Sequence, residues 1–209
     1  MRLSKIKLFD FFYKAYHAWP LIYSNLTQLI SFGQWEEWQQ RVFEDISGHK
    51  ILEIGVGPGK LLLKLVKKGY DITGIELRRG MAFEARRRLK RAGYASQILQ
   101  QSVDKLPFEN EVFDCIVLTF VLAEITHLEK AISEMKRVLK KNGKVIIIAG
   151  GIPQDNNLIA RILFRIVSPH TTLHLQRNNM QYFQSAGFEA RRIDFGPFNI
   201  VNKIVAEKK

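Results

Sequence analysis

The chain has a single cysteine, Cys115, among its 209 residues. This excludes an internal disulfide bond. Cys115 stands in the apolar, β-branched segment Phe113 to Leu118, and such a setting favours a small buried core residue over a reactive thiol. No exposed, electropositive surrounding that would activate the thiol is evident.

The sequence also lacks an uninterrupted apolar run of the ~18 residues that a membrane-spanning helix needs, so we expect no bilayer crossing. The first seven residues resemble the basic end of a signal peptide. Asp10, Lys14 and His17 interrupt the apolar stretch that follows, and no small-residue cleavage site comes after it. These features predict a cytoplasmic protein and not an exported one.

Acidic residues are scarce relative to basic ones: 20 Asp and Glu face 32 Lys and Arg, which gives a formal net charge of +12. Three interpretations of this charge compete: a solvated surface, nucleic-acid binding, and attraction to an anionic membrane such as the inner membrane face. The basic residues cluster in three runs, around 78–79, 86–91 and 136–144. On helices, such runs are usually the solvent face.

Glycine is concentrated where it is most informative. Residues 51–59 read as an apolar strand with a carboxylate near its end, Glu53, followed by Gly55, Gly57 and Gly59 at alternate positions. Glycines adopt backbone conformations closed to other residues and let the chain approach a ligand closely. An apolar helical segment starts at Lys60. A strand, a glycine turn and a helix form half of a βαβ cofactor unit.

The second half follows, because Tyr70 to Glu76 is another short apolar strand that ends in a carboxylate. A carboxylate in this place can accept hydrogen bonds from both hydroxyls of a ribose. The dinucleotide fingerprint G-x-G-x-x-G would need glycine at position 60, where this chain has lysine. The pattern is therefore E-x-G-x-G-x-G.

Over roughly residues 45–150 the chain resembles the class I S-adenosylmethionine-dependent methyltransferases (type 11 methyltransferase domain), especially the ubiquinone and menaquinone biosynthesis enzymes. Besides the glycine turn, three segments carry the resemblance. Ser102 to Phe108 is similar to the adenine-contacting segment, Phe113 to Leu118 to the fourth strand, and Met135 to Val145 to the turn into the fifth strand. Four motifs in the right order are a specific signal.

The resemblance implies S-adenosyl-L-methionine as cofactor, no metal, and a specific set of cofactor-binding residues. Glu53 would fix the glycine loop and the methionine end, Glu76 would hold the ribose, and Asp104 would accept from the adenine amino group. The segment 119–124 would border the methyl group, with Phe120 as a wall. The complete set is Glu53, Gly55, Gly57, Gly59, Glu76, Leu77, Val103, Asp104, Thr119 and Phe120.

Strands alternating with helices predict an α/β fold, a Rossmann-like seven-stranded mostly parallel sheet with helices on both faces. Predicted strands are 50–54, 70–76, 96–101, 112–119 and 144–149; predicted helices are 59–68, 80–92, 127–141 and 181–187. Segments 188–195 and 200–206 lie too close for a helical crossover and predict a C-terminal antiparallel hairpin. The family's sheet also ends this way, with one reversed strand inserted between the fifth and sixth.

We expect a single domain. Its residues 1–46 form an N-terminal helical cover, and residues 47–209 form the methyltransferase fold. The cover is rich in aromatic residues, and 33–45 is a helical candidate in it. We interpret residues 153–180 as an insertion that covers the substrate, because a long connection beside a cofactor site commonly does so. The apolar segment 157–167 with Arg161 and Arg165 predicts an amphipathic helix that packs on the core, with a position on a membrane surface as the alternative.

Methyl transfer from a sulfonium is an in-line displacement, so the protein must mainly align the acceptor and exclude water. A general base is needed only for a protonated acceptor. His170 and His174 are the weak candidates because they lie in the predicted substrate cover; His17 and His127 are further ones. His49 lies at the opposite end of the sheet, and Glu124 could simply begin the next helix.

The aromatic leading segment and apolar cover favour a small, lipophilic methyl acceptor, such as a quinone precursor or a phospholipid headgroup. The family's Asp/Asn-Pro-Pro-Tyr/Phe segment for gripping a nucleic-acid base is absent after position 119, which disfavours nucleic acid as substrate. Two alternatives stay open: an RNA- or membrane-binding protein that retains the fold, and an NAD(P)-dependent oxidoreductase, since Arg78 and Arg79 could suit a 2′-phosphate. We expect a monomer or homodimer.

Overall fold

The structure is a computed structural model, and it describes residues 28, 31–95, 97–155, 157–158, 161–162 and 178–209. Most of the predicted N-terminal cover and of the predicted insertion 153–180 lies outside these residues, as do His17, His170 and His174. No helix of the described part is long and apolar enough to cross a membrane.

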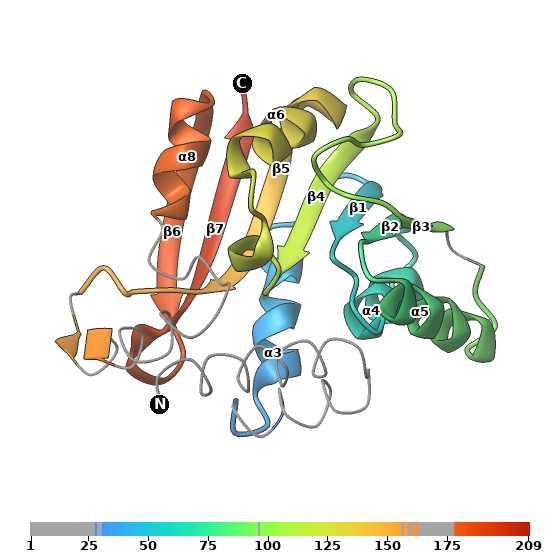
Figure 1. Cartoon of the computed structure of the whole chain (residues 1–209), viewed down its shortest axis with the longest axis horizontal. Helices are drawn as coiled ribbons and strands as arrows, with labels where there is room; N and C mark the ends of the chain where they lie inside the picture. Colours follow the sequence, from blue (N-terminus) through green and yellow to red (C-terminus); the bar gives the residue numbers. More distant parts are fainter. Residues whose placement is uncertain (1–27, 29–30, 96, 156, 159–160, 163–177) are drawn as a thin grey trace, which may run out of the picture.

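A seven-stranded sheet forms the centre of the molecule, with the strand order β3-β2-β1-β4-β5-β7-β6 (Figure 1). The strands are β1 (Lys50–Ile54), β2 (Asp71–Glu76), β3 (Gln97–Gln100), β4 (Phe113–Thr119), β5 (Leu139–Gly150), β6 (Phe188–Phe195) and β7 (Val201–Lys208). The first five pair in parallel, and β7 runs antiparallel to both β5 and β6. The predicted fold, including the reversed strand between the fifth and sixth, is confirmed.

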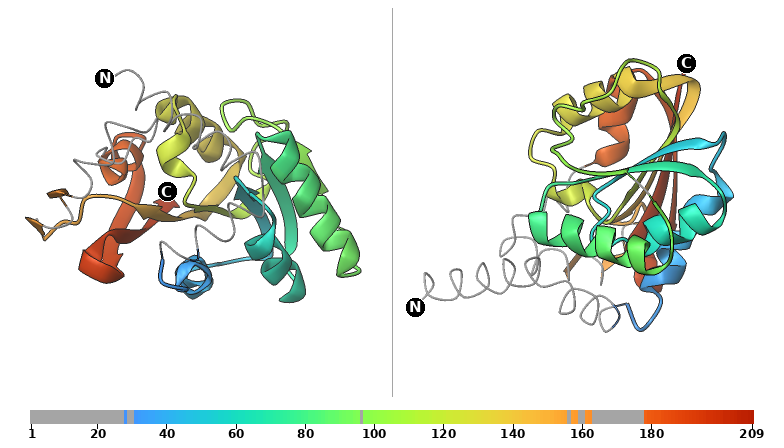
Figure 2. Two further views of the ribbon diagram at one scale, coloured as in Figure 1. Left: turned by 60° about the horizontal axis from the view of Figure 1, so that its bottom comes forward. Right: turned by 90° about the vertical axis from the view of Figure 1, so that its right-hand side faces the viewer.

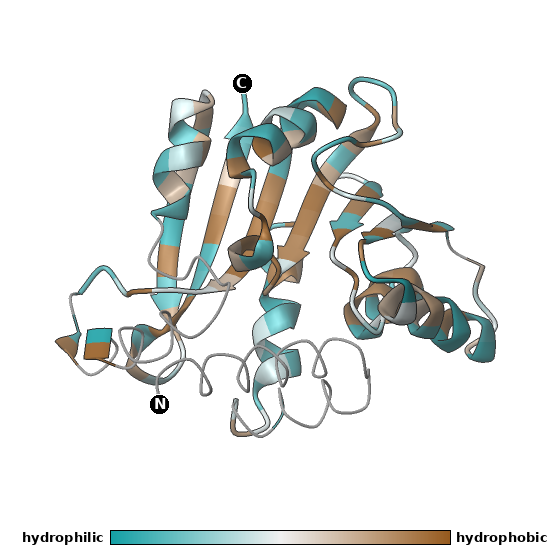
Figure 3. Ribbon diagram, in the orientation of Figure 1, coloured by the Kyte–Doolittle hydropathy of each residue, from teal (hydrophilic) through white to brown (hydrophobic). Residues whose placement is uncertain are grey.

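Helices cover both faces of the sheet, because the central strands are buried on both sides and need apolar partners there. The helices are α3 (Trp35–Gln40), α4 (Lys60–Lys67), α5 (Arg79–Arg91), α6 (Leu128–Val138) and α8 (Asn179–Ser185). One core cluster joins α6 and α8 to the sheet, and the other joins α3, α4 and α5 to its opposite face (Figure 2). The apolar centres of β4 and β5 stand out between the more polar helices in Figure 3.

Cys115 is fully buried in β4, as predicted. Burial raises the pKa of its thiol to about 12. A thiol with so high a pKa is almost entirely protonated at neutral pH, so Cys115 is a packing residue and not a nucleophile.

Two predicted helices were too long. The helix predicted over 127–141 ends at Val138, because Leu139 is already extended (φ −82°, ψ 132°) and pairs with Phe113 at the start of β4. The helix predicted over 33–45 is α3 followed by a 3-10 turn, Arg41–Glu44. In both places tertiary packing overrides helix propensity.

The carboxyl ends of β1, β2 and β4 lie at one edge of the sheet, and α3 lies at that same edge (Figure 1). In a parallel α/β sheet, ligands bind in the crevice at this edge.

Candidate active site

A cavity of about 300 Å³ opens at the carboxyl ends of the parallel strands. Its size lies at the lower end of the roughly 300–1,000 Å³ usual for ligand sites. Four chain segments line it: the glycine turn after β1, the end of β2 with the start of α5, the segment after β3, and the segment after β4. These are the four segments in which the sequence places the site.

Eight of the ten residues predicted to bind cofactor line this one cavity: Gly55, Gly57, Glu76, Leu77, Val103, Asp104, Thr119 and Phe120. The other two, Glu53 and Gly59, are not among the residues that line it. These eight residues lie up to 65 positions apart in sequence, from Gly55 to Phe120.

Gly57 is the glycine that leaves room for a ligand. Its backbone has φ +53°, and a Cβ added there would meet nothing within 4 Å. Gly59 has a different role: it precedes α4 with φ +77°, and an added Cβ would lie 2.9 Å from the Cα of Ala85 in α5. The third glycine of the motif thus permits helix packing, whereas the second faces the cavity.

Glu76 ends β2 and is only 6% exposed. Its Oε2 accepts a hydrogen bond from the Gly57 N–H at 2.9 Å, and its Oε1 accepts one from the Arg78 N–H at 2.9 Å. The carboxylate thereby fixes both the glycine turn and the start of α5. Each oxygen keeps a second lone pair, so Glu76 can still accept hydrogen bonds from a ligand in the cavity.

Leu77, Val103 and Asp104 also line the cavity. Leu77 is 65% exposed although it is a large apolar residue. Asp104 is half-buried, and its N–H donates to the Ser102 hydroxyl at 3.3 Å. An exposed apolar side chain near a carboxylate suits a planar ring that carries an amino group.

Glu53 is 1% exposed, and its Oε2 has no hydrogen-bond partner among the residues that the structure describes. Burial, and after it the negative charge of Glu76, raises the pKa of the Glu53 carboxyl well above its usual value. Glu53 is thus buried next to the cavity, and it is not among the residues that line it. Its predicted contact with the methionine end of a cofactor stays a prediction.

The burial of Glu53 predicts a pH-dependent stability. Because its folded-state pKa is raised, the native state holds a proton that the unfolded chain releases above about pH 4.3, and stability falls as pH rises from there toward the folded-state pKa. We expect Glu53→Gln to increase the free energy of unfolding at neutral pH by roughly 1–3 kcal/mol. Thermal unfolding across pH checks this, and a less stable variant at neutral pH would contradict it.

Helix α3 is attached to the cavity wall. The Trp35 ring stacks on Phe120 with 3.8 Å between centroids, and Gln39 Nε2 donates to Thr119 Oγ1 at 2.8 Å. Phe120 has a positive φ of +57°, a conformation that costs energy for a non-glycine residue and persists only where the surroundings impose it. Residues of the predicted N-terminal cover therefore hold the segment after β4.

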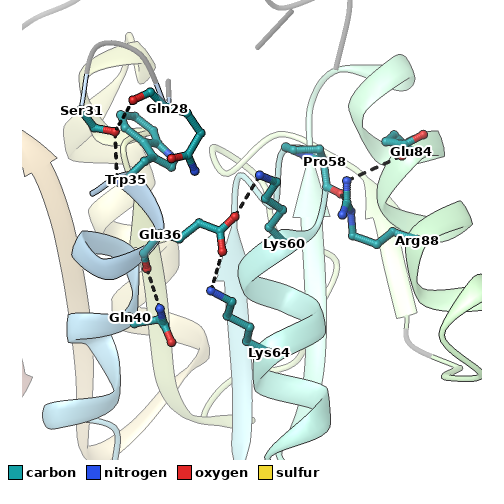
Figure 4. Close-up of polar contacts among 10 residues, drawn as sticks. All are labelled: Gln28, Ser31, Trp35, Glu36, Gln40, Pro58, Lys60, Lys64, Glu84 and Arg88. Atoms are coloured by element: carbon teal, nitrogen blue, oxygen red, sulfur yellow. Dashed lines mark hydrogen bonds and ion pairs between the residues drawn. The ribbon is translucent and has the colours of Figure 1, made fainter. Parts of the chain in front are cut away.

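Glu36 anchors α3 to α4 from the side. Its two carboxylate oxygens contact Lys60 Nζ at 2.9 Å and Lys64 Nζ at 2.8 Å (Figure 4). These lysines lower the pKa of Glu36 to about 2. The Glu36 carboxylate is partly exposed and solvent screens its charge. The two ion pairs therefore fix the position of α3 more than they stabilise the fold.

Sequence reasoning missed one pair in the cavity. Arg78 Nη1 lies 2.7 Å from Glu124 Oε2, which links the end of β2 to the segment after β4 across the cavity. From the sequence, Arg78 is linked only to a 2′-phosphate, and Glu124 belongs to the segment 119–124 predicted to border the methyl group or begins the next helix. The available signal was that both residues follow parallel strands, β2 and β4, which lie on either side of β1 and end at the same edge of the sheet.

His127 also lines the cavity. His49 lies before β1, at the opposite end of the sheet, where its backbone N–H donates to Asp114 Oδ2, as expected. The two histidines preferred from the sequence, His170 and His174, lie outside the described residues. Of the described histidines, His127 is the one near the predicted chemistry.

Residues 52–147 match the family described as "Methyltransferase domain". A ubiquinone/menaquinone biosynthesis C-methyltransferase from Pseudomonas putida is 31% identical over 156 residues, which cover 71% of this chain and 60% of that protein. The chain thus spans about 60% of the length of this curated relative.

Solved structures share the fold. A SAM-dependent methyltransferase from Thermotoga maritima has a TM-score of 0.70 at 20% identity, and the match covers 93% of this chain and 100% of that chain. Geranyl diphosphate C-methyltransferase from Streptomyces coelicolor, solved with Mg²⁺, geranyl diphosphate and S-adenosyl-L-homocysteine, has a TM-score of 0.70 at 12% identity, covering 83% of this chain and 79% of that one.

The fold and the cavity at its carboxyl edge define a Rossmann-like protein of the methyltransferase class. Residues 52–147 carry the domain described as "Methyltransferase domain". The chain is similar in sequence and in fold to class I S-adenosylmethionine-dependent methyltransferases.

Proposed function

We propose that the protein transfers a methyl group from S-adenosylmethionine to a small, lipophilic acceptor. The observation that carries the proposal is the meeting of Gly57, Glu76 and Asp104 on one cavity, with open space beside the Gly57 Cα. S-adenosylmethionine supplies a methyl group on a sulfonium, which is already an activated leaving group. The cavity residues fit this cofactor.

The chain's own residues have separable tasks. Glu76 would accept from the ribose hydroxyls, Asp104 would accept from the adenine amino group, and Leu77 would pack on the ring. The turn at Gly57 would leave space for the methionine end. The segment after β4, held by α3, would position the acceptor and exclude water, and such positioning supplies most of the rate gain in a displacement of this kind.

The acceptor is inferred from two observations. Phe120 lines the cavity and Trp35 supports it from behind, so the acceptor side has an aromatic wall. The curated relative is named for ubiquinone and menaquinone C-methylation. A quinone precursor is therefore our first candidate, and a phospholipid-like headgroup is the second.

Methylation of an aromatic carbon beside a phenolic oxygen requires that the acceptor lose a proton. We propose that His127 is the general base that accepts this proton, because it lines the cavity. Its side chain makes no helix-capping hydrogen bond, so a substitution there removes no cap of α6. We expect His127→Ala to lower kcat about 100-fold and to leave the dissociation constant for S-adenosylmethionine unchanged.

His49→Ala is the matched control, since this histidine lies at the far end of the sheet. Steady-state kinetics and calorimetric titration of both variants check the assignment. Equal kcat values for His127→Ala and the unsubstituted protein would contradict it, and so would a loss of cofactor affinity without a loss of kcat.

Methyl transfer itself is tested with isotopically labelled methyl donor and a panel of demethylated quinols, phospholipids and amines. The proposal predicts label in a quinol product. Cofactor binding without turnover across the panel would favour the alternative of an RNA- or membrane-binding protein that retains the fold.

An NAD(P)-dependent oxidoreductase fits the site less well. Arg78, one of two arginines that could hold a 2′-phosphate, contacts Glu124. The reversed β7 also differs from the parallel continuation of a nicotinamide-binding sheet. Preferential binding of NADPH over S-adenosylmethionine would reverse this choice.

We place the protein in the cytoplasm as a monomer or homodimer, with contact to the inner membrane face.

A further inference from the structure

Helix α5 has two distinct faces. Met81, Ala82, Ala85 and Leu89 are buried against the rest of the protein. The opposite stripe, formed by positions 79, 83, 86–87 and 90, is exposed. The helix lies beside α4 at the outside of the molecule (Figure 1). The exposed stripe is therefore an accessible, convex surface.

This stripe is strongly basic. Six of the 13 residues of α5 are Arg or Lys, and one is acidic. The acidic residue, Glu84, pairs with Arg87 and Arg88, and Arg86 donates to the Ile98 carbonyl. The side chains of Arg79, Lys90 and Arg91 have no hydrogen bond or ion pair with any described residue. Within the part of the chain that the structure describes, no acidic group neutralises these three charges.

Large apolar side chains are exposed among these charges. Phe83 is 64% exposed, one turn after Arg79, and Leu77, just before the helix, is 65% exposed. Tyr94, after the helix, is 37% exposed. Single exposed apolar residues are ordinary. An exposed phenylalanine flanked by unpaired cations on one helical stripe is the pattern of a helix that lies at a membrane interface.

We propose that the exposed face of α5, with Phe83 at its centre, binds a membrane surface that contains anionic lipids. Phe83 enters the boundary between headgroups and acyl chains, while Arg79, Lys90 and Arg91 contact lipid phosphates through their long side chains. Leu77 and Met81, at the start of α5, also line the cavity. The helix that docks is therefore also part of the cavity wall.

A membrane fits this face better than RNA. Between Arg79 and Tyr94 the sequence contains no Asn, Gln, Ser or Thr, so the stripe lacks the neutral polar side chains that complement Arg and Lys in reading base edges. The face is also convex, whereas single-stranded nucleic acid is usually bound in a groove. Docking by α5 assigns the membrane contact of the proposed function to one helix face, and it does not require methyl transfer.

The test is co-sedimentation of the full chain with phosphatidylcholine vesicles, with and without phosphatidylglycerol. We expect binding only with phosphatidylglycerol. The triple variant Arg79→Gln/Lys90→Gln/Arg91→Gln should weaken binding on the order of 100-fold, since each basic side chain near an anionic surface contributes about a factor of five. Phe83→Ser should weaken it on the order of tenfold.

The matched control is Lys67→Gln/Lys130→Gln/Lys141→Gln, which removes three exposed lysines from other elements and changes net charge equally. It should retain most of the binding. Equal losses in the two triple variants, or unchanged binding by Phe83→Ser, would overturn the assignment to α5. So would tighter binding of an oligouridine probe than of anionic vesicles. Cofactor titration of each variant shows that it is folded.

Discussion

Gly57→Leu is expected to weaken S-adenosylmethionine binding by more than 1,000-fold, that is by more than about 4 kcal/mol. The Cβ of residue 57 points into open space in the cavity, so a leucine side chain would occupy the volume assigned to the cofactor. The substitution also strains the backbone, because φ is +53° at this position. Isothermal titration calorimetry measures the affinity directly.

Gly93→Leu separates these two effects. Gly93 also has a positive φ, +78°, and open space around its Cα, but it follows α5 and lies away from the cavity. Both variants should lose stability by about 1–2 kcal/mol from the left-handed conformation. Only Gly57→Leu should lose cofactor binding. Equal affinities for the two variants would show that the cofactor does not lie beside Gly57.

Glu76→Ala is expected to weaken cofactor binding about 1,000-fold. The substitution removes the acceptor proposed for the ribose hydroxyls, and it leaves the N–H groups of Gly57 and Arg78 without their partner. Hydrogen bonds to a charged group are worth about 1.5–3 kcal/mol each, so the losses together reach this size. The glycine turn should also become less ordered.

Asp71→Ala is the control for Glu76→Ala, because Asp71 is exposed and begins the same strand at its other end. Titration calorimetry and thermal unfolding are compared for the two variants. If Glu76→Ala binds S-adenosylmethionine as tightly as Asp71→Ala does, the ribose is held elsewhere and the site assignment is wrong.

The central fold could be predicted because its signals are local and mutually consistent. Each parallel strand is a short apolar run, and Glu76 and the glycine turn mark where strands end. Since parallel strands end at one edge, these residues had to lie near one another. The short spacing between Phe195 and Val201 required the antiparallel hairpin.

Other features depend on contacts that no local pattern encodes. The burial of Glu53 depends on neighbours that are distant in sequence. The early end of α6 at Val138 depends on the pairing of Leu139 with Phe113. The ion pair of Arg78 with Glu124 joins two segments that are 46 positions apart. Local propensity carries no information on such long-range contacts.

The most direct test of the cofactor site is a crystal structure of the protein with S-adenosylhomocysteine. The account predicts the ribose hydroxyls within hydrogen-bonding distance of the Glu76 carboxylate, the adenine amino group at Asp104, and the homocysteine portion beside Gly57. A ligand bound outside this cavity, or bound within it with the ribose away from Glu76, would contradict the account.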